Sequence, residues 1–533
     1  MNRAQSISTI TAAIFLLALL SQASLPAPYQ SDGLTPAERR GQQIYRSGVG
    51  SSAQGITAAL GNSGVELPGS AIACINCHGR EGLGKSEGGL TPSNLTWQAL
   101  TKPYSVSAAT GRKRPPYTEA LLKRAISMGF DSAGNGLHAA MPRYRMTHED
   151  IADLIAYLKK LGTDLDPGLT DASIIIGTTL ITDGRFQEMS SAVKAALAAY
   201  FDDVNKQGGV FNRRIILQPA ESTDSPGERV RAFRQSIERN QPFAVVSAFM
   251  AGADEELASL VKEKEVPLVG AFTLDPHVDY PLNQYAFYIY PGLVNQSEAL
   301  TTFAAERFGK RMPPAAILYT GEKSTRDAAE SIKKLLKQHG WPSVEEVAIS
   351  REQFNATSLV GKLSEKSTEI VFMLVDGESQ RAFIQQARKS NWNPTYFIPG
   401  QIAARELLES REPLAAEAFL SLPTLPSDQT QAGLAEYRRL AEVYKLPANH
   451  RASQMMALAS AKILVEALKR AGRDVSRQKM IEALEGLYRF ETGLTPPITY
   501  NANRRIGSMG AYIVALDREG RGPVPASRFI EPE

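Results

Sequence analysis

The segment Cys74-Ile75-Asn76-Cys77-His78 constrains this chain more than any other feature, because it contains the only two cysteines in 533 residues. Two thiols separated by two residues and followed by histidine have the spacing at which haem is attached covalently. The thiols can form thioethers with the vinyl groups on one edge of a porphyrin, which brings the next side chain beneath the iron. The motif predicts one covalent haem c on Cys74 and Cys77, with His78 as an axial iron ligand.

A Cys-x-x-Cys pair has a second interpretation, a structural disulfide or a thioredoxin-like redox pair. That interpretation leaves His78 unexplained and predicts no second iron ligand downstream. Met141, in Ala140-Met141-Pro142, is a candidate for that ligand, because a thioether is a soft neutral donor that favours ferrous iron. Other side chains lie close enough in sequence to compete: Met128, His138, Met146 and His148.

The N-terminal residues predict an export signal. Arg3 precedes a run over residues 7–20 that is apolar apart from one serine and two threonines, and Ser21-Gln22-Ala23 offers small residues for cleavage. The apolar run is shorter than the roughly 20 residues that a spanning helix needs. We therefore expect a signal peptide over residues 1–23, cleaved near Ala23, and a periplasmic protein. An uncleaved membrane anchor is the alternative.

Composition limits the remaining possibilities. With 43% hydrophobic and 22% charged residues, the chain is globular and too long for one ordinary core, so we expect two or three domains. A formal charge of +3 gives no reason to expect a nucleic-acid partner. The sequence has no dinucleotide-binding glycine motif, no phosphate-binding loop and no His-Glu-x-x-His helix, so an electron carrier and binding protein is expected rather than an enzyme.

Residues 34–162 predict a small helical domain around the cysteine motif. Thr35 and Pro36 are suited to the N-cap and first position of a helix, on which Gly41 and Tyr45 share a face. Residues 151–161 repeat apolar side chains with helical period. The segment between Tyr45 and Cys74 is rich in glycine and serine, and we expect a surface loop there.

These features together resemble a class I cytochrome c domain, which is a small all-α fold. The Gly41/Tyr45 helix is similar to the first helix of that family, residues 74–79 to its haem-binding segment, and Met141-Pro142 with the helix at 151–161 to its distal ligand and last helix. The resemblance implies His78 and Met141 as the two axial ligands. If both positions are filled, substrates cannot reach the iron, and peroxidase-like activity is not expected.

Residues 163–172 have the Asp, Pro, Gly and Thr content of a linker, and the pattern changes after them. Short apolar runs at 174–177, 215–217, 244–246, 267–269, 316–319, 370–373 and 396–398 predict strands. Amphipathic segments at 191–205, 255–264, 328–339, 380–390 and 453–471 predict helices. This alternation predicts mostly parallel sheets with helices on both faces, and its length predicts two lobes over residues 173–533.

The second part resembles the type I periplasmic solute-binding proteins, in particular the branched-chain amino acid and amide group that includes Leu/Ile/Val-binding proteins. The residues that carry the resemblance are Val204-Asn205-Lys206-Gln207-Gly208-Gly209-Val210, the run at 213–217, and Asp224 with Pro226. The resemblance implies a two-lobed α/β module that closes on a small solute by hinge motion.

The chain departs from amino-acid binders of that group at the residues that hold a zwitterion. The turn at 249–254 lacks hydroxyls, Gln401 stands where an acid holds the ammonium, and a tyrosine near Ser324 is replaced. A weakly charged solute, such as an alcohol, aldehyde, amide or aromatic compound, is therefore expected. Strand ends and helix starts give the pocket candidates Phe186, Phe249, Met250, Thr273, Asp376 and Gln401, each of which could instead pack in the core or cap a helix.

The two parts together predict an exported cytochrome that transfers electrons and recognises either a small organic solute or a partner dehydrogenase. Its redox partner would be a periplasmic dehydrogenase or another cytochrome. The alternative is a solute receptor for an ABC-type membrane transporter or a sensor, in which the redox state of the haem gates solute binding.

Overall fold

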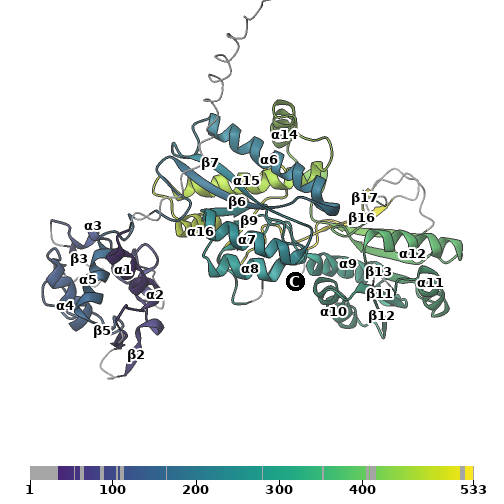
Figure 1. Cartoon of the computed structure of the whole chain (residues 1–533). Coiled ribbons are helices and arrows are strands. Elements are labelled where there is room, and N and C mark those ends of the chain that lie inside the picture. The colour runs from purple at the N-terminus through teal and green to yellow at the C-terminus, as the bar shows by residue number, and fades with distance from the viewer. Residues whose placement is uncertain are drawn as a thin grey trace, which may run out of the picture. The chain divides into compact units, whose positions relative to one another are not determined.

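The fold is described from a computed structural model of the chain (Figure 1). The structure describes residues 34–52, 54–60, 65–84, 89–103, 106–107, 113–163, 165–278, 280–350, 353–403, 407, 416–516 and 523–531. The predicted signal peptide lies outside these residues. Within the described ranges, no helix is long and apolar enough to cross a membrane. The chain divides between Leu165 and Asp166 into two compact units.

The first unit is mainly helical, as predicted, and its helices begin where the sequence offers caps. Its helices are α1 (Pro36–Ser47), α2 (Cys74–His78), α3 (Trp97–Leu100), α4 (Glu119–Met128) and α5 (His148–Leu158). At the start of α1, Thr35 and Glu38 bond to each other's backbone N–H, which satisfies two donors that the first turn leaves free. Thr118 and Thr147 cap α4 and α5.

The helices α1 and α5 cross at Gly41. A Cβ atom at Gly41 would lie 1.9 Å from the carbonyl oxygen of Asp153, so only glycine permits this close approach. One turn later, the rings of Tyr45 and Tyr157 pack with their centroids 5.6 Å apart, and both side chains are fully buried. The predicted helical face of Gly41 and Tyr45 is therefore the contact face of α1.

The first unit also contains two small antiparallel sheets that the sequence did not lead us to expect. One has the strand order β2-β1-β5, with β1 at Thr57–Ala59, β2 at Glu66–Pro68 and β5 at Arg143–Arg145. The other pairs β3 (Val106–Ser107) with β4 (Lys113–Arg114). Part of the segment predicted as a surface loop between Tyr45 and Cys74 thus forms strands. A 3₁₀ turn, η1 (Gly69–Ala71), leads from β2 toward Cys74.

The second unit has two lobes, as predicted. The first lobe contains a parallel sheet of order β10-β9-β8-β6-β7, with β6 (Ser173–Ile181), β7 (Arg214–Ser222), β8 (Ala244–Val246), β9 (Leu268–Val269) and β10 (Ala286–Phe287). The helices of this lobe are η2 (Gly184–Phe186), α6 (Gln187–Lys206), α7 (Pro226–Asn240), α8 (Asp254–Glu263), α14 (Gln431–Val443), α15 (Arg451–Ala471) and α16 (Arg477–Glu485).

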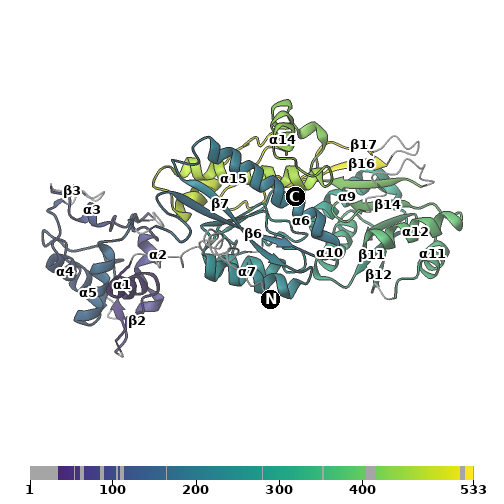
Figure 2. The same cartoon turned by 45° about the horizontal axis from the view of Figure 1, so that its top comes forward.

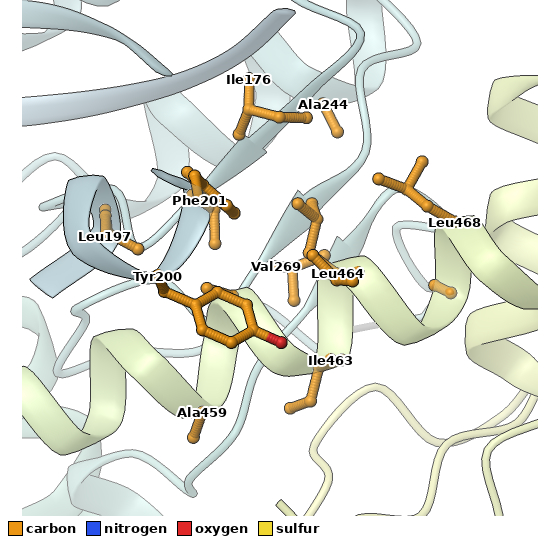
Figure 3. Close-up of a cluster of buried hydrophobic side chains, with 14 of the residues drawn as sticks. Ile176, Leu197, Tyr200, Phe201, Ala244, Val269, Ala459, Ile463, Leu464 and Leu468 are labelled. Atoms are coloured by element: carbon orange, nitrogen blue, oxygen red, sulfur yellow. The ribbon is translucent and has the colours of Figure 1, made fainter. Parts of the chain in front are cut away.

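Helices from distant parts of the chain cover one face of this sheet. Figure 3 shows side chains of α6 and α15, among them Leu197, Phe201 and Leu464, meeting over β6, β8 and β9, where Val269 of β9 packs against them. In the turned view of Figure 2, α15 lies beside α6. Helices α7 and α8 pack on the opposite face around a separate core cluster. Sheets covered on both faces explain why the strands are continuous apolar runs.

The second lobe contains a sheet of order β12-β11-β13-β14-β15-β16-β17, parallel from β12 to β15 and antiparallel beyond. Its strands are β11 (Ala315–Thr320), β12 (Val344–Ile349), β13 (Ile370–Leu374), β14 (Thr395–Pro399), β15 (Ala418–Leu422), β16 (Tyr512–Leu516) and β17 (Pro523–Pro525). Helices α9 (Leu293–Phe308) and α10 (Lys323–Gln338) cover one face, and α11 (Ala356–Glu365) and α12 (Gly377–Lys389) the other. Short 3₁₀ turns are η3 (Gly309–Arg311) and η5 (Pro426–Asp428).

The chain passes between the lobes three times. Tyr288 lies in the core of the first lobe and Leu293 in that of the second, and the chain returns between residues 422 and 437. The last passage joins Ile506 to Ala511. Three connections close together allow two rigid lobes to move about a shared hinge.

The start of the second unit is firmly attached to it. The Asp166 carboxylate accepts a bond from the Arg477 backbone N–H at 2.6 Å, and Leu169 is buried in the core. On the other side, Leu161 is buried in the core of the first unit. Five residue steps separate Leu161 from Asp166, so their Cα atoms lie at most about 18 Å apart.

Candidate functional site

The Cys74–His78 segment forms a single helical turn, α2, that ends at Gly79 with a φ of 72°. Residues at positions i, i+3 and i+4 share one side of a helix, so this turn gathers Cys74, Cys77 and His78. Cys74 is half-buried, Cys77 is exposed, and both are free thiols in this structure. The Tyr45 hydroxyl donates to the Gly79 carbonyl at 2.7 Å, which ties the end of the turn to α1.

The imidazole of His78 has the protonation pattern that a metal ligand needs. Its Nδ1 lies 2.9 Å from the Ser93 carbonyl oxygen, which can only accept, so Nδ1 carries the proton and Nε2 is free to bind iron. Only 7% of His78 is exposed, and this burial lowers the pKa of the ring, although the Ser93 carbonyl opposes the shift. A neutral imidazole held in this way fits the proximal position of a haem.

Cys74 and Cys77 lie in different surroundings. Burial raises the pKa of the Cys74 thiol to about 11, so this sulfur is protonated at neutral pH until it reacts. The phenol of Tyr144 lies against Cys74, and its hydroxyl donates to the carbonyl of Ile72. Cys77 faces solvent. Two free thiols and a neutral imidazole on one turn are the donor set that a covalent haem requires.

Met141 lies where it can contact the interior of the first unit. It is half-buried against the core, whereas 61% of Met128 is exposed and His138 and His148 are also exposed. Met146 is half-buried and packs on the same core. The Met141 backbone is held at both ends, because its N–H donates to the His138 carbonyl at 3.0 Å and the Arg143 guanidinium donates to its carbonyl. Met141 therefore stays the predicted sixth ligand.

At the facing edges of the two lobes, the structure brings together two of the predicted pocket residues. Nε2 of Gln401 in the second lobe donates to the carbonyl oxygen of Thr273 in the first lobe at 3.2 Å. Close by in sequence, Nζ of Lys323 lies 3.5 Å from a carboxylate oxygen of Asp275. These contacts join the segment after β9 to the first residue of α10 and to the segment after β14.

Asp254 is a residue of this edge that was not among the pocket candidates chosen from the sequence. The Thr273 hydroxyl donates to its carboxylate, and the Gly252 N–H donates to Oδ2 at 2.8 Å. Desolvation raises the pKa of Asp254 despite these two bonds, and the nearby Asp275 adds to the shift. The Asp254 carboxylate thus occupies one backbone donor of the turn at 249–254 and the hydroxyl of Thr273 beside it.

The other four pocket candidates have structural roles. Phe249 and Met250 are 3% and 1% exposed, and Phe249 stacks on Phe272 with ring centroids 4.8 Å apart. Phe186 packs half-buried against the core of the first lobe. Asp376 caps α12 by accepting bonds from two backbone N–H groups. Core packing and capping were the alternatives for these residues, and the structure shows those contacts.

A polar pocket that the sequence did not suggest lies beside the ends of β6 and β7. It encloses about 380 Å³ and is lined by Thr182, Glu221, Ser222, Thr223, Glu228, Arg231, Ala232 and Gln235. None of the predicted pocket residues is among them. Among the described residues, no three His, Cys, Asp or Glu side chains gather at a metal-binding distance.

The comparisons with known proteins agree with this architecture. Residues 173–521, more than half of the chain, match the model of the periplasmic binding protein family, and residues 68–162 match that of cytochrome c. The chain therefore belongs to the periplasmic binding protein family and carries a cytochrome c domain before the binding module. A search of curated proteins found no match.

Solved structures show the same fold in the second unit. A branched-chain amino acid ABC transporter protein from Thermus thermophilus with bound valine is 16% identical, with a TM-score of 0.58 over 68% of this chain and 97% of its own. A possible leucine/isoleucine/valine-binding protein from Rhodopirellula baltica is 18% identical (TM-score 0.56, 67% and 98%). A fatty acid ABC transporter substrate-binding protein from Thermomonospora curvata is 16% identical (TM-score 0.56, 69% and 95%).

Proposed function

We propose that the chain is an exported electron-transfer protein that also binds a small, weakly charged organic solute. The observation that carries the electron-transfer part is the helical turn α2, which presents two thiols and a neutral imidazole on one side. A haem held there by Cys74 and Cys77, with His78 and Met141 on the iron, supplies one-electron transfer and leaves no open position for substrate. An exposed Cys77 fits a haem edge that a redox partner can approach.

The electron-transfer proposal is tested by expressing the full chain, with its export segment, together with a haem-ligation system. The purified protein is expected to be red and to keep its haem in acidified organic solvent, because thioethers survive this treatment. A Cys74→Ser, Cys77→Ser variant is expected to lose the pigment. A colourless wild-type protein, or pigment extracted equally from both, would contradict covalent attachment.

The solute-binding proposal rests on the fold of the second unit and on the residues at the lobe edges. Although two structural neighbours are named for branched-chain amino acids, this chain has Gln401 where an acid would face an ammonium group. Asp254 already takes the Thr273 hydroxyl and the Gly252 N–H, which argues against a carboxylate ligand at this turn. A neutral solute avoids both conflicts.

The solute class is tested by thermal shift with matched compounds of one carbon skeleton: leucine, isovalerate, isovaleramide and 3-methylbutanol. A ligand at a hundred times its Kd stabilises the folded state by about 2.7 kcal/mol. The amide or the alcohol is expected to raise the melting temperature of the second unit. A shift with leucine or isovalerate alone would contradict a weakly charged solute, and no shift with any compound would favour docking to a protein such as a dehydrogenase.

A further inference from the structure

We infer that Tyr144 is a positioning residue for the sixth iron ligand, acting through a brace formed by the sheet β2-β1-β5. The brace joins the segment that carries Met141 to the segment that carries Cys74. This inference rests on the proposed function, because it requires Met141 to bind the iron.

The most direct part of the brace is one hydroxyl group. Tyr144 lies three residues after Met141, and its side chain is 5% exposed. Its hydroxyl donates to the carbonyl of Ile72, two residues before Cys74, and the phenol lies against the Cys74 sulfur. A single side chain therefore links the start of the haem-attachment turn to the strand that follows the methionine.

The sheet makes the same connection through the backbone. Each of the three residues of its central strand β1 pairs with both neighbours, and Ala58 stands opposite Tyr144 on β5 and opposite Leu67 on β2. Strand β2 continues through η1 into the Cys74 turn, and β5 begins two residues after Met141. The strands that approach the two iron ligands are thus held in one register.

The segment that supplies β1 and β2 is packed against the helices. A Cβ atom at Gly48 would lie 2.0 Å from the Gly69 carbonyl oxygen, so the end of α1 touches the turn after β2. The Gly69 N–H donates to the Ile56 carbonyl at 2.7 Å. The Ser51 N–H donates to Asp150 at the start of α5 at 3.1 Å. These contacts give the brace a fixed support on both long helices.

Arg143 also holds the backbone of the Met141 segment. Its guanidinium donates to the carbonyls of Met141 and of Leu137, the latter at 3.1 Å. The side chain lies over Gly129, where a Cβ atom would stand 1.8 Å from Nε of Arg143. Tyr144 fixes the strand after Met141 and Arg143 binds the Met141 carbonyl, so the backbone around Met141 has little freedom.

Such restraint has a chemical purpose. A thioether is a neutral and weak iron ligand, so an imidazole or a water molecule replaces it readily when the sulfur moves away. Functional groups act well only when their neighbours hold them within about 0.5 Å of the working geometry. Removing the Tyr144 hydroxyl while keeping its ring should therefore weaken the iron–methionine bond.

The test compares Tyr144→Phe with Tyr117→Phe in the full-length haem protein. Tyr117 lies in the same core and is 8% exposed, but it belongs to neither ligand segment. The readout is the apparent affinity for added imidazole, followed by loss of the methionine-linked absorbance band, together with the midpoint potential. Tyr144→Phe is expected to bind imidazole about threefold to tenfold more tightly, as the loss of one hydrogen bond permits, whereas Tyr117→Phe should stay within about twofold of wild type.

If Tyr144→Phe keeps the methionine-linked absorbance band, the imidazole affinity and the midpoint potential of the wild type, the positioning role of Tyr144 is wrong. The proposed ligation by His78 and Met141 would still stand. A wild-type protein without the methionine-linked band would overturn the proposed ligation, and with it this inference. If Tyr144→Phe does not accumulate with haem, the substitution Ala58→Gly loosens the central strand while the Tyr144 side chain stays unchanged. The same tighter binding of imidazole is expected from it.

Discussion

At the scale of single residues, Asp254 is a carboxyl group whose surroundings disfavour its charge. Desolvation raises its pKa, so the folded chain holds the proton more tightly than the unfolded chain does. The stability that this proton contributes is fully present below the unfolded pKa and is lost as the pH rises through the folded pKa. At neutral pH the ionised group therefore costs stability.

Asp254→Asn is expected to raise the melting temperature of the second unit at about pH 7 and to raise it less at about pH 4, because the benefit of the amide falls as the wild-type carboxyl group takes up its proton. The amide keeps an acceptor for the Gly252 N–H. Calorimetry at both pH values checks this, with Glu255→Gln on the exposed face of the same helical turn as the control. If Asp254→Asn instead loses stability, and loses more at pH 7 than at pH 4, the ionised Asp254 does not destabilise the folded state.

Met141→Leu tests the sixth ligand. Leucine has nearly the same volume but no sulfur, so the methionine-linked absorbance band should disappear and the midpoint potential should fall by at least about 59 mV, a tenfold change for one electron. Met146→Leu, on the same core, should preserve both. Visible spectra and redox titration measure the two properties, and the reverse pattern would make Met146 the ligand.

At the scale of elements, the crossing of α1 and α5 depends on Gly41. A methyl group there would meet the Asp153 carbonyl at 1.9 Å, and neither helix can move without disturbing Tyr45 and Tyr157. Gly41→Ala is expected to destabilise the first unit by about 1–3 kcal/mol. Denaturant unfolding followed through the haem absorbance measures this loss.

Gly136→Ala is the matched control, because a Cβ atom there has no neighbour within 4 Å. It should change stability by less than about 0.5 kcal/mol. If Gly41→Ala and Gly136→Ala lower the free energy of unfolding equally, close approach of α1 and α5 at Gly41 is not the cause of the loss.

Elements with a strong local pattern could be predicted from the sequence. The apolar runs at 174–177, 316–319 and 370–373 lie in β6, β11 and β13, and Thr35 caps the start of α1 as expected. The sheet β2-β1-β5 could not be predicted, because Thr57–Ala59 and Glu66–Pro68 are short and show no apolar alternation. Its register depends on a pairing of Ala58 with Tyr144, far away along the chain.

The candidate sites, too, contain some features that could be predicted from the sequence and others that could not. The spacing of Cys74, Cys77 and His78 is a local property, so the sequence alone was enough to single them out as the proposed haem-binding residues. The contacts of Asp254 with Thr273, of Lys323 with Asp275 and of Tyr144 with Ile72 join residues that are distant in sequence. No local pattern records such contacts, and a single sequence contains no covariation from which to infer them.

At the scale of the whole molecule, Arg477 joins the C-terminal helices to the first sheet of the second unit. Its side chain is 4% exposed and donates to the carbonyls of Pro242 at 2.7 Å and Phe243 at 3.0 Å, with further bonds to Lys264 and Glu265. Arg477→Ala would leave these buried carbonyls without their donor and is expected to cost about 3 kcal/mol or more.

Thermal unfolding of the second unit, followed by circular dichroism, measures the effect of Arg477→Ala. Gln478→Ala, which loses only a bond to Glu482 on its own helix, should fall within about 0.5 kcal/mol of wild type. If the two variants have the same melting temperature, the bonds that Arg477 donates are not a main source of stability.

The short span between Leu161 and Asp166 has a consequence for electron delivery. Because both residues are anchored in their own units, any macromolecule that captures the binding module also holds the cytochrome c domain on a short tether. A short linker of this kind corresponds to an effective concentration in the mM range. If the cytochrome c domain transfers electrons as proposed, an acceptor located beside such a receptor needs no appreciable affinity of its own for that domain.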